Sequence, residues 1–244
     1  MALRQKKQRD ERGLFVVEGV KLVADLLRGG LVPTFIAATD EALEQQAIAA
    51  INCEKAACTV KEIAEVSQRQ SGQEMVAIFC KPAEVVISKP NDAVLLLDEI
   101  QDPGNLGTII RIADWFGIHT IVASRTTADA FAPKVVQASM GAIARVHVVE
   151  TDIVEYLTRN AREWHLPVYG TFLEGANIYT AQLASPAIIV MGNEGNGISA
   201  AVKPFVSDKL FIPNYPAGAT TSESLNVSAA TAIVCSEFRR RNFS

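Results

Sequence analysis

Six short apolar runs in the second part of the chain restrict its fold more than any other feature. They show little alternation between apolar and polar residues, and most are rich in β-branched side chains. Such runs are typical of strands buried on both faces, as in a mostly parallel sheet covered by helices. The runs occupy residues 93–97, 120–123, 146–149, 168–172, 187–191 and 209–212. Segments with helical spacing separate or follow them, at 105–116, 133–143, 152–163, 199–205 and 222–240. We therefore predict an α/β fold.

A smaller α/β unit is predicted before this sheet. Its expected strands are residues 14–17, 32–37 and 75–80, and its expected helices are 20–27, 41–50 and 61–66. Pro82 and Pro90 then stand among polar residues, which is typical of a linker. We predict one domain at residues 1–85 and a second at 91–244.

Composition places the chain among ordinary globular proteins. Of its 244 residues, 49% are hydrophobic and 20% are charged. No apolar run reaches the roughly 18 residues of a membrane span, and the basic N-terminus lacks a following apolar segment of secretory type. We expect a cytoplasmic protein with no membrane partner.

The net charge of −4 argues mildly against binding to nucleic acid, which needs local Lys and Arg. Basic residues nevertheless concentrate in residues 1–12 and at Arg239-Arg240-Arg241. Solvated helix ends and an RNA-contacting patch are both compatible with these clusters.

Cysteine and histidine spacing does not suggest a metal site. The four cysteines (Cys53, Cys58, Cys80, Cys235) and three histidines (His119, His147, His165) form no ligand pattern. We interpret the cysteines as buried hydrophobes and regard a catalytic Cys/His pair as a minor alternative.

A predicted helix begins near Asn105, after the turn Asp102-Pro103-Gly104. Asn105 suits the N-cap position, and Gly117 suits the position after the helix end. The apolar residues of this helix share one face, and Arg111 points nearly opposite to it. On spacing alone, an ordinary solvated arginine is the favoured interpretation of Arg111.

A glycine-rich loop, Gly192-Asn193-Glu194-Gly195-Asn196-Gly197, follows the apolar run that ends at Met191. Glycines allow a ligand to approach the backbone closely. The loop matches neither the dinucleotide-binding fingerprint nor the phosphate-binding P-loop. Glu194 could be a general base, could orient a cation such as Arg111, or could be an exposed turn carboxylate.

The last predicted helix opens with Thr220-Thr221-Ser222-Glu223, which has the pattern of a capping box. Ser224, Asn226 and Ser228 are then expected in its first turns, where free N–H groups can hold a polar ligand. For Asn226 taken singly, local capping is the favoured interpretation.

Taken in order, these segments resemble the SpoU (TrmH-like) ribose 2′-O-methyltransferases of the SPOUT superfamily. The matching residues are Asn105–Ala113, Met191–Ile198, Ile212-Pro213 and Ser224–Ser228. The resemblance covers about residues 93–240 and extends more weakly to Arg9, Phe15–Gly19 and Leu22, which are similar to the family's substrate-binding domain.

This resemblance implies a trefoil-knotted C-terminal domain with helices on both faces of its sheet, and a homodimer that completes the active site. It implies S-adenosylmethionine as cofactor, held near Thr171, Leu173, Gly192, Ile212, Leu225 and Asn226. It implies a catalytic set of Arg111, Asn105, Glu194, Ser224 and Asn226, and no metal. Because arginine is rarely deprotonated, we hypothesise that Arg111 stabilises the developing alkoxide electrostatically.

The implied substrate is structured RNA, with ribosomal RNA favoured over transfer RNA because the separate N-terminal domain resembles those of ribosomal enzymes. A non-catalytic RNA-binding or assembly factor is an alternative, as is a dinucleotide-dependent oxidoreductase suggested only by the α/β pattern. The missing fingerprint argues against the oxidoreductase. The binding factor is disfavoured because the catalytic set is intact: Asn105, Arg111, Glu194, Ser224 and Asn226.

The chain departs from the family pattern in two places. The segment 214–223 is longer than usual, and Asn214 replaces a common methionine. The resemblance also leads us to expect that the first part of the usual substrate domain is missing. We expect both departures to affect RNA contacts more than the chemistry.

Overall fold

The computed structural model describes residues 2–67, 72–83, 85–216 and 222–241. The chain forms two compact units, the first made of residues 1–83 with 129–145 and the second of residues 84–128 with 146–244. Segment 129–145 therefore groups with the first unit, although it lies within the sequence range predicted for the second domain. Each unit has its own sheet and core.

The first unit is built on a four-stranded sheet in the order β1-β4-β2-β3. β4 runs antiparallel to both of its neighbours, and β3 is parallel to β2. The strands are β1 (Leu14–Glu18), β2 (Pro33–Ala38), β3 (Glu54–Ala57) and β4 (Met75–Cys80). The helices are η1 (Ala2–Arg4), α1 (Lys6–Arg12), α2 (Val20–Arg28), α3 (Asp40–Leu43), α4 (Gln46–Ala49), α5 (Val60–Val66), α7 (Pro133–Ala138) and η2 (Ala142–Ala144).

Contacts within the first unit explain why residues 129–145 belong to it. The ring of Phe131 lies 5.0 Å from that of Phe15 on β1, measured between centroids. Arg9 on α1 is 3% exposed and donates to the Asp129 carboxylate from both Nε (2.8 Å) and Nη2 (2.5 Å). Its Nη1 donates to the carbonyl oxygens of Leu3 and Arg4, both at 2.8 Å. A buried arginine thus joins the N-terminus to a segment distant in sequence.

The second unit is built on a six-stranded sheet in the order β10-β8-β9-β5-β6-β7, in which every neighbouring pair is parallel. The strands are β5 (Val94–Leu97), β6 (Thr120–Ser124), β7 (His147–Thr151), β8 (Val168–Asn177), β9 (Ile188–Met191) and β10 (Asp208–Phe211). The helices are α6 (Pro103–Trp115), α8 (Ile153–Arg159), η3 (Asn160–Trp164), η4 (Lys203–Phe205) and α9 (Val227–Arg240). The predicted parallel α/β sheet is confirmed.

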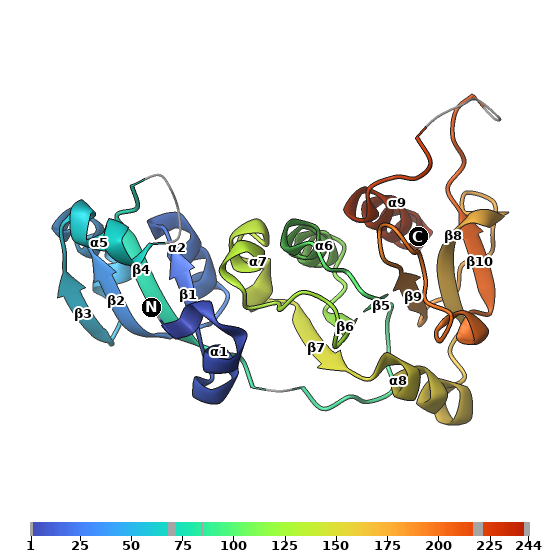
Figure 1. Ribbon diagram of the computed structural model, residues 1–244, viewed down its shortest axis with the longest axis horizontal. Coiled ribbons are helices and arrows are strands. Elements are labelled where there is room, and N and C mark those ends of the chain that lie inside the picture. Colours follow the sequence, from blue (N-terminus) through green and yellow to red (C-terminus); the bar gives the residue numbers. More distant parts are fainter. Residues whose placement is uncertain (1, 68–71, 84, 217–221, 242–244) are drawn as a thin grey trace. The chain divides into compact units, whose positions relative to one another are not determined.

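Helices cover both faces of this sheet, with α6 and α9 on one side and α8 on the other (Figure 1). The alternation of side chains along β5 accounts for the two layers. Val94 and Leu96 pack in one cluster with Ile153 and Leu157 of α8, while Leu95 points to the opposite face. All four residues of β5 are buried, which explains the apolar run without alternation.

Several predicted elements differ from those observed. The expected helix 41–50 is two short helices, α3 and α4, and the expected helix 199–205 is only the three-residue η4. β3 was not predicted, because Glu54-Lys55-Ala56-Ala57 contains no β-branched or aromatic residue. This strand lies at the sheet edge, where it pairs with β2 alone.

None of the helices in the described ranges combines the length and apolar character needed to span a bilayer. The trefoil knot implied by the resemblance stays a prediction.

Candidate active site

The carboxyl ends of β5 and β9 form the point at which the strand order reverses. From β5 the chain continues toward β6 and β7, whereas β8, β9 and β10 lie on the other side of β5. Loops that leave two adjacent strands in opposite directions open a crevice, and α/β sheets bind ligands at such positions. The loops concerned follow Leu97 of β5 and Met191 of β9, which are paired across the ladder.

Direct hydrogen bonds fix these two loops to each other. Asn193 Nδ2 donates to the Glu99 carbonyl oxygen at 2.8 Å, and Ser199 N donates to Asp98 Oδ2 at 2.7 Å. Asp98 is 2% exposed, and Glu99 has a left-handed backbone with φ of 63°. The glycine-rich loop is therefore held rigidly over the end of β5.

Asn105, in the first turn of α6, is the centre of a polar cluster at this edge. Its Nδ2 donates to Glu194 Oε1 at 2.5 Å. Its Oδ1 accepts from Asn226 Nδ2 at 3.0 Å and from Ser228 Oγ at 3.3 Å. The cluster joins three segments that lie far apart in the sequence, and it contains three of the five predicted catalytic residues: Asn105, Glu194 and Asn226.

The N-cap of α6 is Asp102 rather than the predicted Asn105. Asp102 Oδ1 accepts from the backbone N–H of Asn105 at 2.8 Å, and Pro103 occupies the first helical position. Asn105 is thereby relieved of capping, and its side chain is available to the cluster. The predicted apolar face of α6 is confirmed, because Leu106, Ile109 and Ala113 are buried, and Gly117 follows the helix with φ of 63°.

The last helix begins later than predicted, at Val227 instead of residue 222. Asn226 is its N-cap, and its Oδ1 accepts from the backbone N–H groups of Ser228 (3.0 Å) and Ala229 (3.3 Å). Of the proposed capping box, Thr220 and Thr221 lie outside the described residues. Asn226 therefore serves two purposes, since its Oδ1 caps α9 and its Nδ2 binds Asn105.

Ser228 belongs to the cluster; the sequence placed it in the first turns of the last helix, where it could hold a polar ligand, but not in the catalytic or cofactor-binding set. It is 7% exposed, and its Oγ donates to Asn226 Oδ1 at 2.5 Å as well as to Asn105. Its position two residues after Asn226 is the sequence feature that could have placed it in the cluster. In a helical first turn, that spacing brings the hydroxyl back to the capping side chain.

Arg111 and Ser224 remain outside this cluster. Arg111 is exposed on α6, and within the described part of the chain no hydrogen bond or ion pair connects its side chain to another residue. Ser224 is also exposed, and its carbonyl oxygen accepts from Ser222 Oγ at 3.4 Å. A role for Glu194 in orienting Arg111 of the same chain has no contact to support it.

Gly192 is required for a reason other than ligand approach. A Cβ placed there would lie 2.4 Å from the carbonyl carbon of Gly197 and 2.4 Å from the nitrogen of Ile198. The loop closes on itself through an antiparallel bridge between Asn193 and Gly197. The missing side chain thus makes room for the loop's own backbone.

The other predicted cofactor residues lie on β8 or on segments after β10. Thr171 Oγ1 donates to the Val190 carbonyl oxygen at 3.4 Å, beside the end of β9. Leu173 and Leu225 are 67% and 50% exposed, and Ile212 is half-buried immediately after β10. Leu173 is not at a strand end as predicted, because β8 continues to Asn177.

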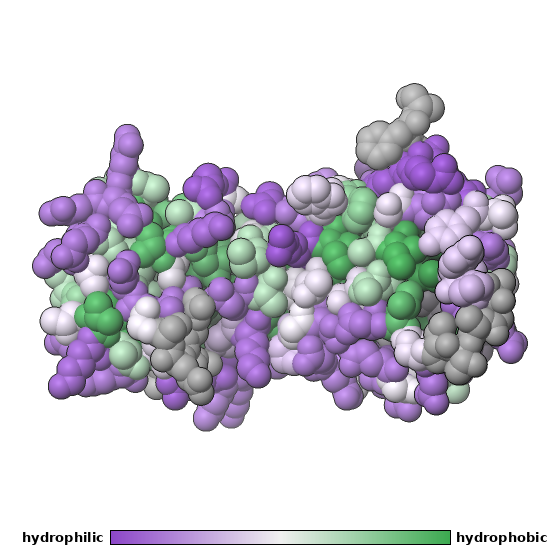
Figure 2. All heavy atoms as spheres, turned by 90° about the horizontal axis from the view of Figure 1, so that it is seen from above, coloured by the Kyte–Doolittle hydropathy of each residue, from purple (hydrophilic) through white to green (hydrophobic). Residues whose placement is uncertain are grey.

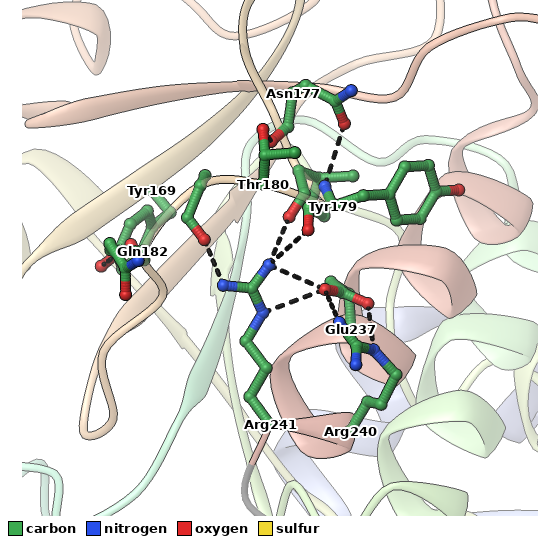
Figure 3. A network of polar contacts seen from close by, with 10 residues as sticks. Tyr169, Asn177, Tyr179, Thr180, Gln182, Glu237, Arg240 and Arg241 are labelled. Carbon is green, nitrogen blue, oxygen red and sulfur yellow. Dashed lines mark hydrogen bonds and ion pairs between the residues drawn. The ribbon is translucent and has the colours of Figure 1, made fainter.

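The basic C-terminus forms internal contacts. Arg241 donates to the carbonyl oxygens of Ile178, Tyr179 and Ala181 and to Glu237, which Arg240 also binds (Figure 3). Arg239 forms an ion pair with Asp92. These arginines attach the end of α9 to the rest of the unit. The sequence had suggested either solvated helix ends or an RNA-contacting patch, and neither includes such internal contacts.

Titratable groups elsewhere do not suggest a second catalytic centre. Burial raises the pKa of the Cys235 thiol to about 12, so this cysteine is a poor nucleophile. Among the described residues, no three His, Cys, Asp or Glu side chains are grouped in a way that could hold a metal ion.

Both halves of the chain match known protein families. Residues 92–236 match the SpoU rRNA Methylase family, and residues 1–77 match the MRM3-like substrate binding domain. The chain is 31% identical over 239 residues to the 23S rRNA (guanosine(2553)-2′-O)-methyltransferase of Bacillus subtilis, an alignment that covers 97% of this chain and 93% of the relative.

Solved structures give the same result over the whole length. A TrmH-family protein from Porphyromonas gingivalis is 41% identical with a TM-score of 0.86, covering 98% of this chain and 94% of that one. An rRNA methyltransferase from Sinorhizobium meliloti with bound S-adenosylmethionine is 31% identical with a TM-score of 0.86, covering 100% and 93%.

Proposed function

The chain belongs to the SpoU rRNA methylase family, and on this premise we propose that it transfers a methyl group from S-adenosylmethionine to a ribose 2′-hydroxyl of ribosomal RNA. The observation that carries the proposal is the cluster of Asn105, Glu194, Asn226 and Ser228 at the reversal point of the sheet. The relatives named above as rRNA methyltransferases support ribosomal RNA as the substrate class.

The residues around this edge fit the cofactor. S-adenosylmethionine combines an apolar adenine with polar ends, and sites for such ligands pair apolar side chains with a few polar groups. Leu173 and Leu225 leave apolar surface exposed, and Thr171 provides a hydroxyl at the end of β9. When bound, the cofactor supplies an electrophilic methyl group.

Arg111 is proposed as the residue that stabilises charge on the reacting ribose oxygen. A 2′-hydroxyl is a weak acid, so a fixed guanidinium beside it favours the developing alkoxide. The exposed Arg111 side chain is available for this task, and arginine keeps its charge near neutral pH. Asn105, Asn226 and Glu194 hold the loops that shape the site, and the exposed Glu194 lies where it can also contact RNA.

We further propose that the active site is completed across a homodimer, in which Arg111 serves the cluster of the partner copy. Hydrophobic residues gather on the side of the second unit formed by α6 and α9 (Figure 2). Trp115 on α6 is 82% exposed and lies one helical turn after Arg111. An exposed apolar surface next to the arginine suits an interface that delivers it to a second copy.

Mixing two inactive variants tests the composite site. In a mixture of Arg111→Ala and Asn226→Ala chains, each mixed dimer has one site with both changes and one with neither. We expect about a quarter of wild-type activity to return on mixing. If Arg111 instead serves the cluster of its own chain, mixing will restore nothing. The fluorescence of Trp115 on dilution reports dimer dissociation independently.

The reaction itself is tested by transfer of tritiated methyl from S-adenosylmethionine to total RNA from a strain that lacks the gene. The label should appear in ribosomal RNA and map to a ribose. Label on a base would exclude the 2′-hydroxyl, and label only in transfer RNA would exclude the ribosomal substrate. We also propose a cytoplasmic location for the protein.

A further inference from the structure

Helices α6 and α9 lie side by side and run in the same direction. Hydrogen bonds join their N-terminal ends to each other and their C-terminal ends to each other. At their N-terminal ends, Asn226 and Ser228 bind Asn105. At their C-terminal ends, Arg239 of α9 binds the backbone of Phe116 and Gly117, just after α6. The active-site cluster is therefore one end of a pair of helices whose other end is also fixed by hydrogen bonds.

All three nitrogen atoms of the Arg239 guanidinium donate hydrogen bonds. Its Nε donates to the Phe116 carbonyl oxygen at 2.6 Å, and its Nη2 donates to that of Gly117 at 2.9 Å. Its Nη1 and Nη2 also form a two-pronged ion pair with Asp92, at 2.8 and 2.7 Å. The carbonyl groups at a helix C-terminus lack partners within the helix and attract cations, so this end of α6 is a favourable site for an arginine.

The distances along the two helices agree with this arrangement. At about 1.5 Å per residue, Asn105 to Phe116 spans roughly 16 Å, and Asn226 to Arg239 spans roughly 19 Å. Helical side chains lean toward the N-terminus of their helix. Arg239 can thus reach back by the difference of about 3 Å to the end of α6.

Axial position matters because the hydrogen bonds of the cluster tolerate little displacement. Apolar contacts between Ile109, Ile110 and Ala113 of α6 and neighbouring residues are not directional. A slide of one residue, about 1.5 Å, would lengthen the 3.0 Å bond from Asn226 to Asn105 to about 3.4 Å if the slide is perpendicular to the bond, and to about 4.5 Å if it is along the bond. Either change weakens the bond or breaks it. A directional contact at the far end restricts such a slide.

We propose that Arg239 is a positioning residue, which fixes α9 axially against α6 and thereby holds Asn226 and Ser228 on Asn105. The inference rests on the proposed function, since it concerns the same cluster. Arg239 lies at the opposite end of α9 from the cluster and does not touch the reacting atoms. Its effect reaches the site through the length of α9.

Arg240 provides a matched control on the same helix. Its side chain is 65% exposed, and it binds Glu237 of its own helix rather than α6. Changing Arg240 to Lys therefore alters the same residue type one position away without altering the contact between the helices.

The test compares Arg239→Lys with Arg240→Lys and the wild-type chain, using methyl transfer to ribosomal RNA well below each melting temperature. Lys retains a charge, but its three N–H donors cannot reproduce the four hydrogen bonds that the planar guanidinium forms with Asp92, Phe116 and Gly117. For Arg239→Lys we expect kcat to fall about 10- to 100-fold, since a misplacement of about 1 Å can have such an effect. KM values for RNA and S-adenosylmethionine should stay within about twofold, and Arg240→Lys should match the wild type.

A crystal structure of Arg239→Lys gives a measure independent of activity. The separation of Asn226 Nδ2 and Asn105 Oδ1 should exceed about 3.5 Å, the usual limit for a hydrogen bond. If the variant melts at a lower temperature but keeps wild-type kcat and an intact Asn226–Asn105 bond, Arg239 is merely structural and the proposal is wrong.

Asp92→Asn gives a second variant in case Arg239→Lys does not fold. It weakens the ion pair but leaves the bonds from Arg239 to Phe116 and Gly117 in place, so at least half of kcat should remain. A loss as large as for Arg239→Lys would locate the effect at Asp92, before β5, and overturn the proposal. A wild-type chain without methyl transfer would instead contradict the proposed function, which separates the two failures.

Discussion

Each unit contains a cluster of hydrogen-bonded polar side chains, and the two clusters differ in their exposure to solvent. In the first unit, Arg9 is 3% exposed and all its contacts are to Asp129 and backbone carbonyl oxygens. In the second unit, Asn105 is half-buried, while Glu194 and Asn226 are exposed at strand and helix ends. The first cluster fixes chain segments, and the second leaves polar atoms where a ligand can reach them.

The type of residue alone therefore does not identify a functional site in this chain. Arg9 and Arg111 are both arginines on helices, yet one is enclosed by fixed partners and the other faces solvent. Mutations in the first cluster should therefore affect stability, and mutations in the second should affect catalysis.

The largest expected effect comes from Arg9→Ala. The change removes the donor to Asp129 Oδ2, on a side chain that is 11% exposed, and to the carbonyl oxygens of Leu3 and Arg4. Asp129 Oδ1 still accepts from the backbone N–H of Phe131. Breaking such a buried pair should lower the free energy of unfolding of the first unit by about 3–5 kcal/mol. Urea unfolding followed by circular dichroism measures it. Arg12→Ala, on the same helix but exposed, should change stability by less than about 0.5 kcal/mol.

Arg111→Ala should produce the opposite pattern, with kcat lower by about 10²- to 10³-fold and little change in stability. An exposed side chain contributes little to folding, but the developing charge would lose its main stabilising group. Initial-rate methylation assays measure kcat, with exposed Arg162→Ala as the control. If Arg111→Lys retained most of the turnover, a role specific to the guanidinium would be wrong.

Asn105→Ala is expected to lower kcat by about 10- to 100-fold, because the loop at Glu194 and the start of α9 would lose their common partner. Asp102 still caps α6, so the melting temperature should change little. Since Asn105 and Asn226 act in one network, the double variant Asn105→Ala/Asn226→Ala should be scarcely worse than the poorer single variant. Additive losses would show that the two side chains act independently.

The smallest effect is a pH dependence of stability at the end of α9. Hydrogen bonds from Arg240, and with it Arg241, lower the pKa of Glu237 to about 2, below its ordinary value of 4.5. The charged form is favoured in the folded state, so the contribution is complete above about pH 5 and is lost as the pH falls toward 2. In wild-type protein this contribution to the free energy of unfolding should be about 1–2 kcal/mol, and thermal melts at several pH values should show that Glu237→Gln removes it. Glu163→Gln, whose partner Arg159 is exposed, should change it by less.

Local sequence patterns predicted most of the second unit. The strands β5 and β9 are fully buried, and burial on both faces leaves only apolar residues, which makes the run recognisable. Helix ends were predicted less well, because several residues near each end could act as the cap. Asp102 and Asn226 perform that function, whereas the sequence suggested Asn105 and Thr220–Glu223.

The order of residues along the chain was enough to predict the parallel α/β sheet, the family and three members of the cluster, since each depends on residues close together or in a fixed order. The folded chain was needed to show that Ser228 hydrogen-bonds to Asn105, that Arg111 and Ser224 lie outside the cluster, and that residues 129–145 pack with the first unit. A hydrogen bond such as that from Arg9 to Asp129 depends on distance in space, which local spacing along the chain does not specify.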